Sequence, residues 1–198
     1  MLFRSVEDSD DDAYRYLAAV TKGRTPEGKL RAYLASAPAM LRWLAEHTHA
    51  TFTALAKYPD YYPEVPGGKP GGRSVEAAAF DGRKLGRELF RLRMPHPQEC
   101  VAGRVMMSAA EAHEALFGSK AAQRAVVGKL LRYFLDVWER LYWRRDTRLT
   151  IGNALVARLR LSMLDRGVPL WLGTSVDALV VEGERVVGVE ATRDGRRL

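Results

Sequence analysis

The chain has 198 residues, 47% hydrophobic and 28% charged, a composition typical of a globular protein with a buried core rather than of a disordered chain. Its single cysteine, Cys100, excludes a disulfide framework. The formal net charge of +7 would suit an anionic partner, but the excess is mostly arginine scattered over predicted helix faces, so plain solvation of the surface is the simpler explanation.

The first residues, MLFRSVEDSDDD, lack an apolar segment and become acidic at once, which argues against a signal peptide. No apolar run approaches the roughly 18 to 20 residues that span a bilayer. We therefore expect no membrane span and a cytoplasmic location.

Three helices are predicted near the N-terminus. The acidic run at residues 8–12 suits the positive end of a helix dipole, and Gly23 supplies a stop. Thr25-Pro26 opens a second helix with proline at its first position. Ser36-Ala37-Pro38 is expected to start a third.

The middle of the chain is less regular. A short strand, TFTAL, is predicted at residues 51–55. The segment YPDYYPEVPGGKPGGRS at residues 58–74 mixes tyrosine, proline and glycine in a way that no regular helix or strand could hold. Residues 81–97 are expected to be irregular, with a helical turn or two.

Helical patterns return after residue 107. Ser108 and Glu111 form a capping box that starts a helix, and Gly118 ends this helix. A long helix is then predicted over residues 121–144. Its apolar residues form one broad stripe, as a core-facing helix requires: Val126, Val127, Leu130, Leu131, Phe134, Leu135, Trp138, Leu141 and Tyr142.

The character of the chain changes at residue 150. Gly152-Asn153 opens a helix over residues 154–165, which Arg166-Gly167 closes. Three strands are then predicted, at residues 168–172, 176–182 and 185–192. A turn at Asp194-Gly195 starts a further strand, which has almost no length before residue 198. Because a strand so short leaves its neighbour unpaired, we expect these residues to be a piece of a longer protein.

Three stretches resemble the flavoprotein dehydrogenases of the succinate dehydrogenase/fumarate reductase superfamily, and within it the 3-ketosteroid Δ1-dehydrogenases. They are TPEGKLRAYLASAPAMLRWLAEHT (25–48), YPDYYPEVPGGKPGGRSVEAAAFDGRKLG (58–86) and IGNALVARLRLSMLDRGVPLWLGTSVDALVVEGERVVGVEATRDGR (151–196). The third pattern is common to the superfamily, whereas the second is specific to the steroid-dehydrogenase-like branch. Residues 90–148 match poorly.

The resemblance implies an α/β fold, α+β within this fragment. Residues 1–150 would be mostly helical and hold an active-site loop at 58–74. Residues 151–198 would supply the helix, strand and β-meander of a Rossmann-like FAD-binding domain. The Gly-x-Gly-x-x-Gly phosphate fingerprint does not occur in the sequence, and the cap domain and C-terminal flavin segment would also be absent. The fragment alone would therefore be inactive.

The implied reaction dehydrogenates a 3-oxo steroid-like substrate, with hydride passing to FAD and a proton to a tyrosine-assisted base. The motif Asp60-Tyr61-Tyr62-Pro63-Glu64 matches the family segment that contributes an active-site tyrosine. This match assigns the role to Tyr61, which would support the proton-abstracting tyrosine of the cap domain by a hydrogen bond. Tyr62 and Tyr58 are the alternatives if the register differs. All three rings could instead pin the loop to the core.

Other residues of the resemblance have competing interpretations. Gly67-Gly68 and Gly71-Gly72 could let the loop lie against flavin or substrate, or could simply form tight turns. Arg73 could contact an anionic cofactor group, although a structural salt bridge is favoured. Val176 matches a position whose backbone bonds the FAD adenine, and an ordinary core valine is the alternative. Gly152-Asn153 resembles the glycine pair or Gly-Asn before the family's helix, and its role as a helix start is favoured over a ligand contact.

The residues predict no metal site, because His47 and His49 lack nearby carboxylates or thiols and surface or core histidines are favoured. A competing function is a small basic binding module without catalysis. The predicted long helix carries basic residues that could lie along phosphates, but Asp136 and Glu139 interrupt them and no nucleic-acid motif occurs, so nucleic acid is not expected as a partner.

Overall fold

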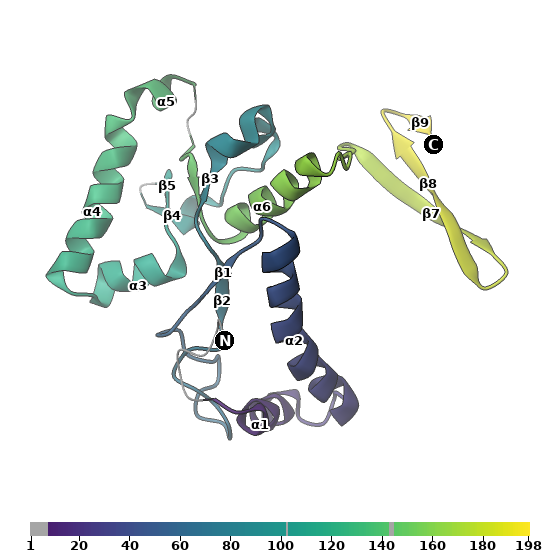
Figure 1. The fold of residues 1–198 in the computed structure, drawn as a ribbon, viewed down its shortest axis with the longest axis horizontal. Helices are drawn as coiled ribbons and strands as arrows, with labels where there is room; N and C mark the ends of the chain where they lie inside the picture. Colours follow the sequence, from purple (N-terminus) through teal and green to yellow (C-terminus); the bar gives the residue numbers. More distant parts are fainter. Residues whose placement is uncertain (1–7, 102, 143–144) are drawn as a thin grey trace. The chain divides into compact units, whose positions relative to one another are not determined.

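The structure, a computed structural model, describes residues 8–101, 103–142 and 145–198 (Figure 1). The chain divides into two compact units, Met1–Ser162 and Met163–Leu198, and each is described by itself. Within the described ranges, the helices include none long and apolar enough to cross a membrane. Both helices and strands are present, and all strand pairs between described residues are antiparallel.

The elements in chain order are α1 (Asp10–Thr21), α2 (Glu27–His47), β1 (Phe52–Ala54), β2 (Val75–Ala77), β3 (Phe80–Asp81), the 3-10 helix η1 (Gly82–Arg91), the 3-10 helix η2 (Pro97–Glu99), β4 (Cys100–Val101), β5 (Val105–Met106), α3 (Ala109–Phe117), α4 (Lys120–Leu135), α5 (Val137–Tyr142), β6 (Arg148–Leu149), α6 (Ile151–Asp165), β7 (Thr174–Glu182), β8 (Arg185–Arg193) and β9 (Arg196–Arg197).

Helix ends follow local sequence closely. Ser9 caps α1 by accepting a hydrogen bond from the backbone N–H of Asp12, and three aspartates occupy the first turn. The predicted capping box of Ser108 and Glu111 is present at the start of α3, with both reciprocal hydrogen bonds. The N-terminus of α2 is one position later than expected, since Pro26 is its N-cap rather than its first helical residue.

The prediction of a third helix at Ser36-Ala37-Pro38 is wrong. Helix α2 runs without interruption from Glu27 to His47 and contains Pro38 in its interior. A proline lacks the N–H that would bond four residues back, so it commonly ends or bends a helix. Here α2 continues through Pro38 without that hydrogen bond. The helix packs beside α1.

The single helix predicted over residues 121–144 is also wrong. Asp136, with φ −79° and ψ 60°, separates α4 from α5, and residues 143–144 lie outside the described residues. The apolar stripe does not face a core within the described chain, because only Val126 of the predicted set is buried. Leu135 and Trp138 are each 78% exposed.

The core of the first unit lies where β3, β6, η1 and α6 meet. Phe80 of β3 pairs with Leu149 of β6, and Leu89 of η1 and Ala154 of α6 are buried beside them. Burying these apolar side chains is the main stabilising term. Buried Thr150 joins β6 to α6, so the first turn of α6 is fixed directly by the core.

Arg158 attaches α6 to the segments around β1 and β3. Its guanidinium donates hydrogen bonds to the carbonyls of His49 (2.7 Å), Ala78 (3.0 Å) and Ala79 (2.9 Å). Burial lowers the pKa of this arginine, since its partners are neutral carbonyls rather than carboxylates. The side chain thus satisfies backbone acceptors at the base of the β1–β2 pair.

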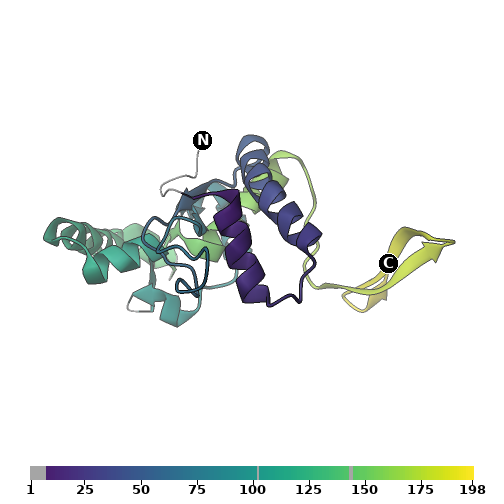
Figure 2. The ribbon, with the colours of Figure 1, turned by 90° about the horizontal axis from the view of Figure 1, so that it is seen from below.

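The second unit is an antiparallel sheet in the order β7-β8-β9, in which β7 and β8 form a long twisted ribbon (Figure 2). The strands predicted at residues 176–182 and 185–192 occur, slightly longer than expected, and β9 follows the predicted turn at Asp194-Gly195. The strand predicted at residues 168–172 is wrong: these residues form no strand and their side chains are exposed. Their apolar run had suggested a buried strand, but no described neighbour pairs with it.

Candidate active site

The irregular segment at residues 58–74, here called the tyrosine loop, lies in the connection between β1 and β2. The two strands pair antiparallel, with Ala54 opposite Val75. Two backbone hydrogen bonds close the base of the connection. The N–H of Gly72 donates to the carbonyl of Leu55, and the N–H of Leu55 donates to the carbonyl of Ser74, both at 2.9 Å. A hydrogen-bonded hairpin base therefore fixes where the loop begins and ends.

Further backbone bonds fold the loop back on itself. The N–H of Asp60 donates to the carbonyl of Lys69 at 3.0 Å, and the N–H of Lys69 donates to the Asp60 carboxylate at 2.9 Å. Two turns at the tip are closed by bonds from Val65 N to Tyr62 O and from Gly68 N to Val65 O. The loop is consequently ordered by its own backbone, although it contains no helix or strand.

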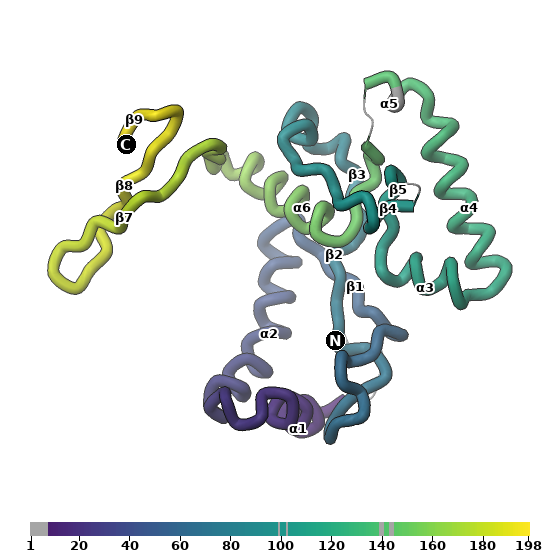
Figure 3. Tube along the Cα trace, turned by 180° about the vertical axis from the view of Figure 1, so that it is seen from behind, coloured from purple at the N-terminus to yellow at the C-terminus, as the bar shows by residue number. Residues whose placement is uncertain are grey.

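The tyrosine loop lies beside α1, as the path of the chain in Figure 3 shows. Gly67 has φ +80°, and a Cβ placed on it would lie 2.2 Å from the Asp12 carbonyl oxygen and 2.9 Å from the Tyr16 nitrogen, both in α1. A Cβ on Gly68 would lie 2.4 Å from the Pro63 carbonyl oxygen within the loop. Gly67 thus allows close backbone approach to α1, and Gly68 allows it within the loop, whereas contact of these glycines with flavin or substrate stays a prediction.

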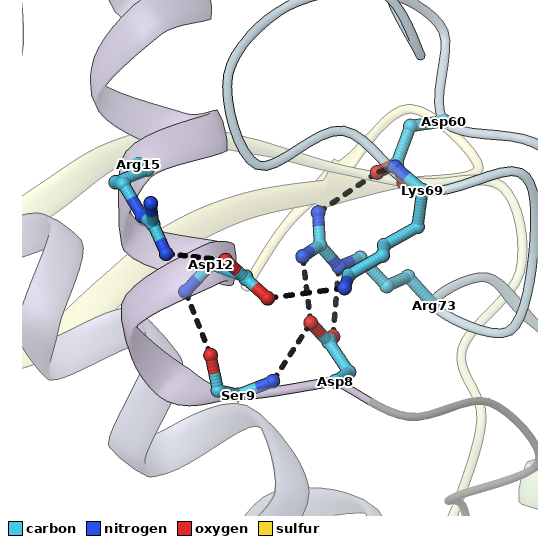
Figure 4. Close-up of polar contacts among 7 residues, drawn as sticks. All are labelled: Asp8, Ser9, Asp12, Arg15, Asp60, Lys69 and Arg73. Carbon is cyan, nitrogen blue, oxygen red and sulfur yellow. Dashed lines mark hydrogen bonds and ion pairs between the residues drawn. The ribbon is translucent and has the colours of Figure 1, made fainter.

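Arg73 joins the tyrosine loop to α1 through carboxylates on both sides (Figure 4). Its Nε and Nη2 donate to the two oxygens of Asp8 at 2.8 and 2.7 Å, and its Nη1 donates to Asp60 at 2.8 Å. The hydrogen bond to Asp8 raises the pKa of Arg73, and the same bond holds the pKa of Asp8 below its usual value. This is the structural salt bridge that the sequence favoured.

A second ion pair lies next to the first. Lys69 Nζ donates to Asp12 Oδ2 at 3.0 Å, which lowers the pKa of Asp12. Arg15 of α1 also pairs with Asp12, at 2.6 Å. These residues together are called the α1–loop ion-pair cluster below: Asp8, Asp12, Arg15, Asp60, Lys69 and Arg73. It contains three carboxylates and three cations. Sequence reasoning missed this cluster: Asp8 and Asp12 had a signal as helix-start residues, but nothing in the pattern paired them with a loop about 60 residues later.

The predicted site tyrosines are presented at the surface of the first unit. Tyr61 is 84% exposed and Tyr62 56% exposed, so neither ring serves as a core anchor. The neighbouring phenol of Tyr61 raises the pKa of Tyr58. The loop thus carries two neighbouring phenols, and Tyr61 directly follows Asp60, whose side chain is largely buried.

Val176 belongs to the second unit, near the start of β7, and its side chain is 62% exposed. It pairs with Ala191, and the register shifts between Val176 and Ala178. In the described sheet β7 is an edge strand, so one row of its backbone donors and acceptors has no strand partner there. Val176 is therefore not a core valine within this unit.

Two other candidates have structural partners. Asn153 accepts a hydrogen bond from Arg145 at 2.6 Å through its side-chain oxygen, and Arg145 also donates to the carbonyl of Leu92 at 2.7 Å. His47 stacks on Trp43. In the part of the chain that the structure describes, no group of three or more His, Cys, Asp and Glu could hold a metal ion.

Comparison with known proteins identifies the family. The FAD binding domain model matches residues 1–198. The chain is 33% identical over 194 residues to the 3-oxosteroid 1-dehydrogenase of Comamonas testosteroni, covering 97% of this chain and 34% of that protein. It is 35% identical over 187 residues to the enzyme of that name from Mycolicibacterium smegmatis, covering 93% and 32%.

A solved structure agrees. The crystal structure of 3-ketosteroid delta1-dehydrogenase from Sterolibacterium denitrificans, in complex with 1,4-androstadiene-3,17-dione, superposes with a TM-score of 0.91 at 40% identity. The match covers 99% of this chain and 36% of that one. The chain thus spans about one third of the length of the relatives it matches. It belongs to the FAD binding domain family, and the relatives it resembles over nearly its whole length are 3-oxosteroid 1-dehydrogenases.

Proposed function

We propose that this chain is one part of an FAD-dependent dehydrogenase that oxidises a 3-oxo steroid-like substrate, and that it is inactive without the rest of the enzyme. The observation that carries the proposal is the structural match to a steroid dehydrogenase, with a TM-score of 0.91. The match covers 99% of this chain but only 36% of the steroid dehydrogenase. The Rossmann-like arrangement of the FAD domain and the cytoplasmic location remain part of this proposal.

Exposed apolar faces support the view that more polypeptide completes the fold. In the first unit, α4 and α5 expose Leu131, Phe134, Leu135, Trp138 and Leu141. In the second unit, both faces of the β7–β8 ribbon expose apolar side chains, among them Leu179 and Val186. Apolar patches of this kind are rare on monomers. We assign their cover to the polypeptide that corresponds to the other two thirds of the relatives.

FAD fits the second unit through the backbone of β7. The free edge of this strand and the irregular register beside Val176 leave main-chain donors and acceptors that an adenine could bond, and the exposed valine side chain offers an apolar contact. When bound, FAD supplies the acceptor of the hydride. The phosphate-binding glycine turn would come from outside these residues.

Tyr61 is the residue of this chain that we place at the reacting steroid ring. Its phenol is exposed, and the backbone bond from Asp60 N to Lys69 O fixes the chain just before it without burying the ring. In the intact enzyme it would hydrogen-bond the tyrosine that removes the proton beside the carbonyl, which stabilises that tyrosine as a phenolate. Tyr62, 56% exposed, would line the substrate side of the same loop.

The test is Tyr61→Phe in the intact flavoenzyme. We expect dehydrogenation to slow by on the order of a hundredfold, as removal of a group that assists acid–base catalysis does, with flavin absorbance unchanged. Tyr33→Phe, which changes a tyrosine 62% exposed on α2, is the control and should have normal turnover. Unaltered turnover of Tyr61→Phe would remove Tyr61 from the site.

The alternative of a basic binding module has less support. It needs a free basic face along α4, but Lys129 of that helix donates to Glu111, which also accepts from Arg148. The exposed face of α4 and α5 is largely apolar. Retention of the chain on DNA that weakens with added salt would favour the module.

A further inference from the structure

The position of Tyr61 cannot come from packing of its own ring, because 84% of the residue is exposed. Its position must come from the bonded backbone on either side of it. The residue directly before it, Asp60, is the opposite case: its side chain is 9% exposed and is bonded to both Arg73 and the backbone N–H of Lys69. Asp60 is therefore the point at which the surroundings can fix Tyr61.

Arg73 supplies the charged partner of the largely buried Asp60 side chain. A carboxylate removed from water needs a charged partner and hydrogen bonds, and Arg73 supplies both at 2.8 Å. Arg73 is itself held in one orientation by the fork of Asp8, at 2.8 and 2.7 Å. These contacts form a continuous path from the start of α1, through Asp8, Arg73 and Asp60, to Tyr61.

The charges of the α1–loop ion-pair cluster argue against a site for an anionic cofactor group. Three carboxylates face three cations, so the cluster has a formal charge of zero, with no excess positive charge left for a ligand. The Nε, Nη1 and Nη2 atoms of Arg73 all donate to carboxylates already. The Arg73 guanidinium is therefore already bonded to carboxylates of the protein, and its contribution is to fix the position of the loop.

We propose that Arg73 is a positioning residue for Tyr61, and that α1 provides the fixed support through Asp8. The proposal rests on the proposed function, in which Tyr61 acts at the steroid ring. Displacement of a reacting or supporting group by about 1 Å can cost a hundredfold in rate. Removing the guanidinium should therefore lower kcat through Tyr61, and should leave KM for the steroid and flavin content near their original values.

The experiment is a double-mutant cycle in the intact flavoenzyme with Arg73→Gln, Tyr61→Phe and both together. We expect Arg73→Gln to lower kcat by roughly ten- to a hundredfold in the original background and to have little further effect beside Tyr61→Phe. An equal loss of kcat in both backgrounds, or no loss in either, would overturn the proposal. Arg31→Gln, which removes an exposed arginine paired with Glu27 on α2, is the matched control.

A second measurement separates this proposal from the proposed function. Hydrogen exchange of the Asp60 and Lys69 amides reports the loop directly, since both N–H groups are bonded within it. Arg73→Gln should speed their exchange at least tenfold, and Arg31→Gln should not. If exchange speeds up but Tyr61→Phe leaves turnover normal, the proposed role of Tyr61 fails; if exchange is unchanged, the positioning role of Arg73 fails. Asp8→Asn, a milder change that keeps Asp60 paired, should show the same effects in smaller measure.

Discussion

Replacing Gly67 by alanine tests how closely the tyrosine loop lies against α1. The added Cβ would have two costs. It would force an alanine into φ +80°, which costs about 1–2 kcal/mol. It would also approach the Asp12 carbonyl oxygen to 2.2 Å, and since this oxygen belongs to a helix backbone that cannot turn aside, relieving the overlap costs about 1–3 kcal/mol. We expect Gly67→Ala to lower the free energy of unfolding by about 2–5 kcal/mol.

Urea unfolding followed by circular dichroism measures this loss. With a slope of about 2 kcal/mol per molar urea, the midpoint should fall by about 1–2.5 M. Two further variants separate the costs. Gly23→Ala has the backbone strain alone, with φ +74° and no atom within 4 Å, whereas Gly68→Ala has the overlap alone, 2.4 Å from the Pro63 oxygen. If Gly67→Ala costs no more than Gly23→Ala, the loop does not lie against α1 and the reasoning is refuted.

Three other predictions concern charge, hydrogen bonding and apolar surface. Because the pKa of Asp8 is lowered in the folded state, its stabilising effect is present above about pH 3.8 and is lost as the pH falls further. Asp8→Asn should therefore flatten the curve of unfolding free energy against pH in this range. An unchanged curve would contradict the ion pair. Arg158→Met leaves three backbone carbonyls without their donor, so a loss of about 1–3 kcal/mol is expected by thermal unfolding, and a neutral result would show that water replaces the guanidinium. Changing both Leu135 and Trp138 to glutamate should reduce self-association of this chain, measured by sedimentation, and should change its free energy of unfolding by less than about 0.5 kcal/mol. The same double change should destabilise the intact enzyme, in which we expect these side chains to be covered. An intact variant of unchanged stability would mean that nothing covers α5.

Features that depend on neighbouring residues were predictable. The start of α1 after an acidic run, the capping box of Ser108 and Glu111, and the turn at Asp194-Gly195 depend on hydrogen bonds and backbone angles within a few residues. The tyrosine loop was likewise recognisable as irregular from its prolines and glycines. Its relation to a flavoenzyme came from resemblance rather than from physical reasoning, and the comparisons confirm the family.

The errors share a cause: local sequence patterns do not reveal which distant segments pack against a helix or strand. Pro38 is a typical helix breaker, yet α2 continues through it. The apolar stripe of the long predicted helix indicated a core, but the helix breaks at Asp136 and its apolar face meets no partner among the described residues. Residues 168–172 looked like a buried strand for the same reason.

By itself, then, the sequence determined the capped helix starts at Ser9 and Ser108, the turn at Asp194-Gly195 and the irregular character of the tyrosine loop. Only the tertiary structure decided that Arg73 is bonded to Asp8 and Asp60, that Gly67 touches α1, and that Tyr61 is exposed. The physical reason is distance along the chain: a cap or turn is complete within about four residues, whereas the partners of Arg73 lie 65 and 13 residues away, and which carboxylate reaches it is settled only when the whole unit folds.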